Sequence, residues 1–139
     1  MVTISIEEVK YTAFRLAKMH LCFDEPIPDF STRPPNILES CVLTPFQIFS
    51  DKALYPTLVN RASILFYLMI KNHPFQNGNK RIAITTLLTF LFLNGKWLKT
   101  DAQSLYNLTV WVASSPARVK ENVVAAIEKL LKDDLVALN

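Results

Sequence analysis

The stretch HPFQNGNKR, residues His73 to Arg81, lies between two apolar runs, SILFYLMIKN before it and IAITTLLTFLFLNG after it. Both runs are typical of buried helices, and a turn between two helices needs only a glycine and a few polar residues. This turn also carries a histidine, a lysine and an arginine. The stretch therefore predicts either an unusually polar turn or a functional site, placed where a buried helix begins.

The two flanking runs predict the central helices of the fold. The run after the motif predicts a helix over about 79–94, and because it is apolar nearly all round we expect it to be the central, buried helix. Gly95 follows it, where a left-handed residue commonly ends a helix. The run before the motif has apolar residues at helical spacing and predicts a helix over 58–71, with Thr57 as its N-cap.

Local signals predict the remaining elements. Thr44 to Phe49 is expected to be extended, because proline resists helix and the other residues favour strand. Capping signals predict further helices. These helices are expected at about 6–21 after the capping box Ser5 and Glu8, at 102–113 after Asp101, and at 116–132 after Ser115, and residues 36–40 are expected to start a short helix. The expected fold class is all-α, a helical bundle around a central buried helix with one short β-hairpin.

Length and composition limit the class of protein. The chain has 139 residues, 50% of them hydrophobic, and a net charge of +3, which predicts one domain over 1–139. Its basic residues are spread along the chain, so direct binding of nucleic acid is not expected. The run from Ile82 to Leu93 is too short to span a membrane and the N-terminus does not resemble a secretory signal, so we expect a cytoplasmic protein. Cys22 and Cys41 are expected to be buried core residues.

The residue types in the motif suit phosphate chemistry. A helix N-terminus attracts anions through its unpaired N–H groups and its dipole, and Gly78 would let a bound group come close. Lys80 and Arg81 add two cations, which are unfavourable in a first helical turn unless an anion binds there. His73 has an unperturbed pKa of about 6.5, which suits proton transfer. Two other interpretations stay open: one is that His73 only ends the preceding helix, and the other is that Asn77 and Asn79 serve only as turn and cap residues.

The motif resembles the signature of the Fic/Doc superfamily, whose members transfer parts of nucleotides to protein hydroxyls. It is similar to the Doc (death-on-curing) branch, which reads approximately H-x-F-x-[DN]-[AG]-N-K-R. Leu38-Glu39-Ser40, Tyr55-Pro56-Thr57 and the order of helices also resemble this branch, over about 5–131. The resemblance implies a Fic-like helical bundle.

The resemblance also implies roles for individual residues. His73 would be the general base that takes a proton from the target hydroxyl, and Phe75 would anchor the loop in the core. Asn77 stands where an acidic residue usually binds Mg²⁺, and an amide is a weaker ligand, so metal contact there is doubtful. The residues that bind the phosphates of the nucleotide would be Gly78, Asn79, Lys80 and Arg81.

Two departures from AMP-transferring relatives point to a kinase. Lys80 replaces a glycine, and Ile84 stands where those relatives have a second arginine. In the Doc branch, the resemblance implies transfer of the γ-phosphate of ATP, with Mg²⁺, to a threonine of translation elongation factor Tu. The target peptide would align as an added strand on a flap that contains Pro45, Phe46, Gln47 and Ile48.

The resemblance further implies a separate antitoxin of the Phd type. Many Fic proteins are inhibited by a helix with the pattern [ST]-x-x-x-E-[GN], but here Ala117 precedes Glu121-Asn122 where Ser or Thr is required. Two alternatives remain open. One is a Fic-type AMP transferase that tolerates Lys80, and the other is a Fic-fold protein that has lost its chemistry and acts only as a binding partner.

Overall fold

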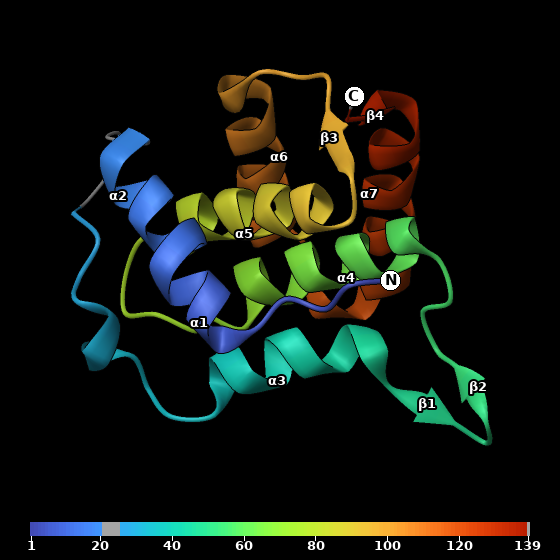
Figure 1. Ribbon diagram of the computed structural model, residues 1–139, viewed down its shortest axis with the longest axis horizontal. Helices are drawn as coiled ribbons and strands as arrows, with labels where there is room; N and C mark the ends of the chain where they lie inside the picture. Colours follow the sequence, from blue (N-terminus) through green and yellow to red (C-terminus); the bar gives the residue numbers. More distant parts are fainter. Residues whose placement is uncertain (21–25, 139) are drawn as a thin grey trace.

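Two adjacent helices form the centre of the fold. The computed structural model describes residues 1–20 and 26–138, and in it α4 (Leu58–Lys71) and α5 (Asn79–Leu93) lie side by side (Figure 1). The all-α class with one short β-hairpin is confirmed, as is the buried helix after the motif. The helix α4 is buried, as its apolar run predicted, and every residue from Ala62 to Ile70 is buried. The reason is that α5, α6, α7 and α3 all pack against it.

The N-terminal helical stretch packs on α5 and contains an irregular turn. It consists of α1 (Ile6–Glu8), η1 (Val9–Phe14) and α2 (Arg15–His20), and the predicted capping box is confirmed. The N–H of Glu8 donates to Ser5 Oγ at 3.1 Å, and the N–H of Ser5 donates to Glu8 Oε1 at 2.9 Å. The π-helical turn η1 was not expected; there the carbonyl of Ala13 accepts a 2.6 Å hydrogen bond from the Thr85 hydroxyl of α5. The predicted end near Leu21 lies outside the described residues.

The next described segment packs on α4 and also contacts α1. It forms the short η2 (Phe30–Thr32) and then α3 (Ile37–Leu43), the short helix that was predicted to start at residues 36–40. Cys41 of α3 is buried as predicted, and burial raises the pKa of its thiol to about 11. Cys22 lies outside the described residues.

The hairpin is shorter than predicted. Thr44–Phe46 form a 3₁₀ turn, η3, so the prediction that Thr44, Pro45 and Phe46 are extended is wrong. Proline is tolerated in a first helical turn. Here the Phe46 ring also packs edge-on against Phe90, with 6.0 Å between centroids, and lies 4.7 Å from the Arg61 guanidinium, so it belongs to the body of the fold.

The strands of the predicted hairpin are β1 (Ile48–Phe49) and β2 (Lys52–Ala53), which pair antiparallel. Gln47 lies at its base, where its carbonyl accepts a 3.1 Å hydrogen bond from the N–H of Leu54. Ser50 and Asp51, at the tip, have φ of 49° and 62°, as a two-residue hairpin turn requires. Ile48 and Phe49 are 70% and 71% exposed, so this hairpin projects from the body of the fold (Figure 1).

A second small sheet joins distant parts of the chain. After Gly95, whose φ of 74° confirms the predicted left-handed end of α5, β3 (Lys96–Leu98) pairs antiparallel with β4 (Leu135–Ala137). Between them lie α6 (Ala102–Ser114), η4 (Ala117–Val119) and α7 (Lys120–Asp134). The Asp101 cap of α6 is confirmed, because Asp101 Oδ1 accepts from the N–H of Ser104 at 2.6 Å.

The predicted start of the last helix is wrong. Ser115 was expected to cap it, but the Ser115 hydroxyl donates to the carbonyl of Val112 at 2.6 Å and so finishes α6 instead. The 3₁₀ turn η4 separates the two helices, and α7 begins at Lys120. Of its predicted apolar face, Val123, Ile127 and Leu131 are buried.

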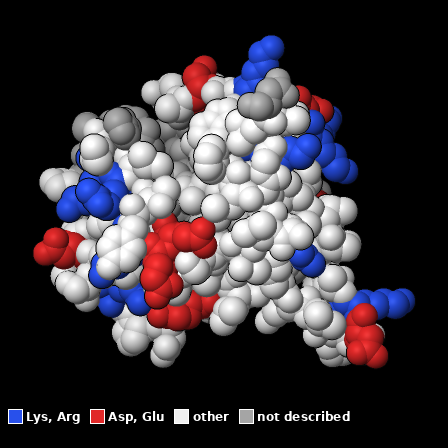
Figure 2. Space-filling view, viewed as in Figure 1, with Lys and Arg blue, Asp and Glu red and all other residues white. Residues whose placement is uncertain are grey.

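The surface shows where charge gathers. On the face drawn in Figure 2, acidic side chains cluster over the region of α1 and α3, while the Lys and Arg side chains are scattered around the edge. In the part of the chain that the structure describes, no helix has the length and hydropathy needed to cross a lipid bilayer.

Candidate active site

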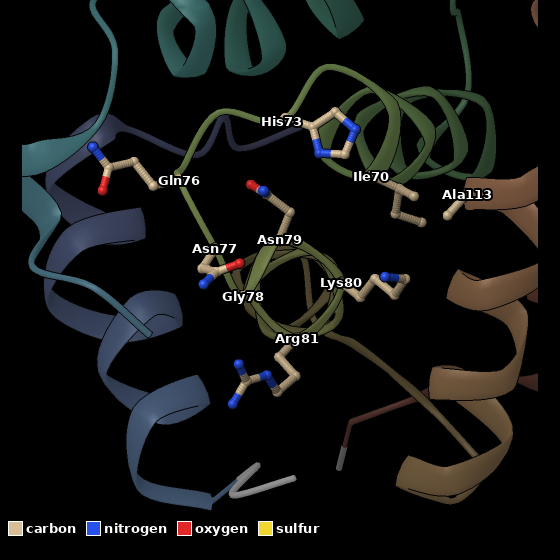
Figure 3. A pocket seen from close by; sticks show the side chains of 9 residues that line it. All are labelled: Ile70, His73, Gln76, Asn77, Gly78, Asn79, Lys80, Arg81 and Ala113. Carbon is tan, nitrogen blue, oxygen red and sulfur yellow. The ribbon is translucent and has the colours of Figure 1, made fainter. Parts of the chain in front are cut away.

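The motif forms the connection between the end of α4 and the start of α5. Asn72 closes α4 with an N–H donated to the carbonyl of Leu68 at 2.9 Å, so Asn72 rather than His73 is the C-cap. His73 then adopts φ 49°, a left-handed conformation in which histidine is more common than most residues. This conformation turns the chain away from the axis of α4, and the exposed imidazole lines a pocket (Figure 3).

Phe75 fastens the loop to the core. It is only 2% exposed and lies in a cluster of three rings, with centroids 5.4 Å from Phe14 and 5.6 Å from Phe30. These rings come from η1 and η2, so the loop is held against two segments that are distant in sequence. The sequence predicted that Phe75 anchors the loop in the core, and an anchor of this kind would require such ring contacts.

Asn79 ties the loop to the first turn of α5. Its Oδ1 accepts from the N–H of Phe75 at 2.9 Å, and its Nδ2 donates to the carbonyl of Phe75, also at 2.9 Å. The sequence led us to expect Asn79 in the phosphate-binding set, but its buried side chain is used within the loop. What it offers to a ligand at the helix terminus is therefore its backbone N–H.

Gly78 is required for two reasons. Its φ is 75°, and a β carbon at this position would lie 2.7 Å from Ile27 Cγ1. The sequence suggested that the missing side chain leaves room for a bound group, but on this side the space is taken by Ile27. The glycine therefore permits the left-handed turn and the close packing of the segment around Ile27 on the start of α5.

We expect Gly78→Ala to destabilise the protein more than Gly95→Ala does. Both glycines are left-handed, with φ of 75° and 74°, so each alanine has the same backbone cost of about 1–2 kcal/mol. A β carbon at Gly95 meets nothing within 4 Å, whereas one at Gly78 overlaps Ile27, which adds about 1–3 kcal/mol. Urea unfolding of both variants measures the difference, and equal losses of unfolding free energy would contradict the role of Ile27.

The start of α5 is suited to an anion. Its first intrahelical hydrogen bond runs from the N–H of Ile82 to the carbonyl of Gly78 at 3.0 Å. The three preceding N–H groups have no acceptor within the helix, and the positive end of the dipole lies here. They belong to residues that line a pocket of about 280 Å³, formed by Ile70, His73, Gln76, Asn77, Gly78, Asn79, Lys80, Arg81 and Ala113. None of these lining residues carries a carboxylate.

The two cations of the motif are placed differently. Lys80 is half-buried and its side chain extends toward α6, whereas Arg81 points away from His73 on the other side of the helix end (Figure 3). Arg81 is 4% exposed, with Nη2 3.4 Å from the position that a β carbon of Gly78 would take. Both lie within the first turn of α5, where their charges add to the positive helix terminus.

The residues of the pocket do not form a carboxylate site for a metal ion. Asn77 is exposed beside Gly78 and offers one neutral amide oxygen (Figure 3). Residues 1–20 and 26–138 contain no group of three His, Cys, Asp or Glu side chains that would hold a metal. Mg²⁺ in proteins is usually held by one or two carboxylates together with substrate phosphates and water. The pocket thus suits an ion that is held mainly by the phosphates of a ligand.

Three of the lining residues, Ile70, Gln76 and Ala113, were missed by the sequence argument. Ala113 belongs to the end of α6, and the end of α6 is held by Lys71, whose Nζ donates to the carbonyls of Ala113 and Ser115 at 3.3 Å and 2.5 Å. These contacts join residues more than forty positions apart, and no local pattern indicates them. Pro45, Phe46, Gln47 and Ile48, predicted as target-binding residues, do not line this pocket.

Comparison with known proteins identifies the class. The family model described as Fic/DOC family matches residues 4–91, which include α1 to α4, the whole motif and α5 up to Leu91, so this chain belongs to the Fic/DOC family. The expected membership of the superfamily is confirmed. The chain is also similar to the protein named Toxin Doc from Mycolicibacterium smegmatis, with 32% identity over 73 residues. That match covers 52% of this chain and 56% of the relative, slightly more than half of its length. No solved structure matches the chain.

Proposed function

We propose that this chain is a Doc-like toxin of a type II toxin–antitoxin system. In this proposal it acts in the cytoplasm as a protein kinase, with ATP as co-substrate and a threonine or serine of elongation factor Tu as acceptor. The observation that carries the proposal is that His73, Lys80 and Arg81 line one pocket at the N-terminus of α5. The family and the name of the similar toxin support the same class.

The proposed reaction follows from this placement. The phosphates of ATP bind at the N-terminus of α5, where backbone N–H groups and two cations are available. His73 takes the proton of the target hydroxyl as the hydroxyl oxygen attacks the γ-phosphorus. A new oxygen–phosphorus bond forms, the bond from the γ-phosphorus to the bridging oxygen breaks, and ADP leaves. His73 is exposed on the pocket, as access to a protein hydroxyl requires.

The hairpin is the proposed place for the target peptide. Among the described residues, β1 and β2 form a sheet of two strands, so each strand has an edge without a strand beside it. An extended peptide can add to such an edge through main-chain hydrogen bonds. Ile48 and Gln47 keep this role in the proposal, together with the exposed Phe49, whereas Pro45 and Phe46 support the base of the hairpin.

Mg²⁺ enters the proposal bound to ATP, since the pocket has no carboxylate. We expect Asn77→Asp to let phosphate transfer saturate at a lower Mg²⁺ concentration, because a carboxylate is a stronger ligand than an amide for this hard cation. Titration of the transfer rate with Mg²⁺ measures the change. Gln76→Glu, which adds the same charge one residue earlier, is the matched control. If both variants respond as the wild type does, position 77 does not contact the metal ion.

A separate antitoxin of the Phd type is the proposed regulatory partner. The reason is that the helix around Glu121 and Asn122 lacks the Ser or Thr of the inhibitory pattern found in many Fic proteins. Induced expression of the chain alone should then arrest growth, and co-expression of such an antitoxin should relieve the arrest.

Labelled ATP tests the proposed chemistry. The protein is incubated with a cell extract and ATP labelled at either the α- or the γ-phosphate, and label on protein is measured. The proposal expects γ-label and no α-label. Transfer of α-label would overturn the kinase and favour an AMP transferase, and transfer of neither label would favour a binding protein without this chemistry.

A further inference from the structure

The pocket is bordered by two helix ends of opposite polarity. Its floor is the N-terminus of α5, whose dipole favours a negative charge. Its wall includes Ala113, in the last turn of α6, where the carbonyl groups carry the negative end of a second dipole. A phosphate group in the pocket is therefore attracted by α5 and repelled by the end of α6 (Figure 3).

The end of α6 carries no basic residue of its own. Its last turn contains no Lys, Arg or His. The hydroxyls of Ser114 and Ser115 donate to the carbonyls of Trp111 and Val112, at 3.0 Å and 2.6 Å, and both of these donors are uncharged. The charge that compensates the end of α6 comes from another helix.

Lys71 supplies that charge. It is the last residue of α4 and is half-buried. Its ammonium group donates to the carbonyl of Ala113 at 3.3 Å and to that of Ser115 at 2.5 Å. Lys71 thus places a full positive charge at the negative end of α6. Because Lys71 is two residues before His73 in the sequence, it also connects Ala113 to the segment that carries the proposed base.

We propose that Lys71 is a positioning residue for phosphate binding: its ammonium neutralises the C-terminus of α6 and holds Ala113 at the wall, which makes the pocket suitable for the polyphosphate of a nucleotide. This inference rests on the proposed use of ATP. It differs from a purely structural role, in which Lys71 would only join α4 to α6. If Lys71 only joined the two helices, its replacement would weaken the binding of every nucleotide by the same factor. If its charge neutralises the end of α6, its replacement should weaken binding more for a nucleotide with more phosphates.

Calorimetric binding of AMP, ADP and ATP tests the inference, with wild type, Lys71→Gln and Lys71→Arg. Glutamine can still donate a hydrogen bond but has no charge, so Lys71→Gln should weaken ATP binding roughly five- to thirty-fold and AMP binding less. Its affinity for ATP should also fall less steeply with added salt than that of wild type. Lys71→Arg keeps the charge and should bind ATP within about threefold of wild type. Lys129→Gln, which removes an exposed charge from α7 outside the pocket, should have no effect.

Each result decides a different question. If Lys71→Gln binds all three nucleotides as wild type does, or loses the same factor for each of them, the electrostatic role of Lys71 is overturned while the proposed kinase stands. If Lys71→Arg loses as much ATP affinity as Lys71→Gln, charge is not the cause and the inference is overturned as well. If wild type binds no nucleotide, the proposed function fails, and this inference fails with it. Should Lys71→Gln not fold, Lys71→Arg is compared with wild type directly, and a loss of ATP affinity well above threefold in this variant, which keeps the charge, overturns the inference.

Discussion

His73→Asn is expected to lower the rate of phosphate transfer by about 10²–10⁴-fold and to abolish growth arrest, while the fold is retained. The loss follows from removing the only imidazole among the residues that line the pocket, which the proposal assigns as the general base. The fold should persist because His73 is exposed and makes no part of the core. Initial rates with labelled ATP measure the effect, with urea unfolding as the check on stability.

Asparagine is the better replacement because of the backbone. His73 has φ 49°, and asparagine tolerates the left-handed region better than alanine does. Comparing His73→Asn with His73→Ala therefore separates loss of the base from strain in the loop. Both variants should lack transfer, and the alanine variant should unfold at a lower urea concentration. A rate close to that of wild type in the asparagine variant would show that His73 is not the base.

Lys80→Gly is expected to lower γ-phosphate transfer by at least about tenfold, since a hydrogen bond to a charged group contributes about 1.5–3 kcal/mol. Lys80 lies in the first turn of α5 and extends toward α6, where it fills space at the edge of the pocket and adds a cation. Removing it opens the helix terminus. Kinetics with γ-labelled ATP measure the loss.

Gain of AMP transfer by the same variant is not expected. Ile84, where AMP-transferring relatives have a second arginine, is 1% exposed and does not line the pocket with His73. Glycine also costs a helix about 1 kcal/mol, so Lys80→Met serves as the control that removes charge without opening the backbone. If Lys80→Met transfers the γ-phosphate at the wild-type rate, the charge of Lys80 is not needed for transfer.

Local patterns predicted those parts of the fold that local contacts determine. Ser5, Thr57 and Asp101 were predicted as helix caps, and each accepts a hydrogen bond from a backbone N–H three residues later. Gly95 was predicted to end α5 for a similar reason. In each case the residue type and the interaction that uses it lie within one turn, so a single short window contains the whole cause.

Most of the features that the sequence did not predict depend on distant contacts, although Ser115 failed as an N-cap through a local hydrogen bond to the carbonyl of Val112. Phe46 belongs to a 3₁₀ turn because it packs on Phe90, and the pairing of Trp97 with Val136 joins segments about forty residues apart. The candidate site also has features that the local sequence predicted and features that depend on distant contacts. The motif placed His73 and Lys80 at the start of α5, but the clamp of Lys71 on the end of α6 appears only in three dimensions.

The mass of purified elongation factor Tu after incubation with this protein, ATP and Mg²⁺ tests the central claim most directly. The account predicts that the factor gains the mass of one phosphoryl group, that fragmentation places it on a threonine or serine, and that the His73→Asn variant adds none. A gain equal to an AMP group, or no gain while the same preparation arrests growth, would contradict the assignment of a kinase that acts on this factor.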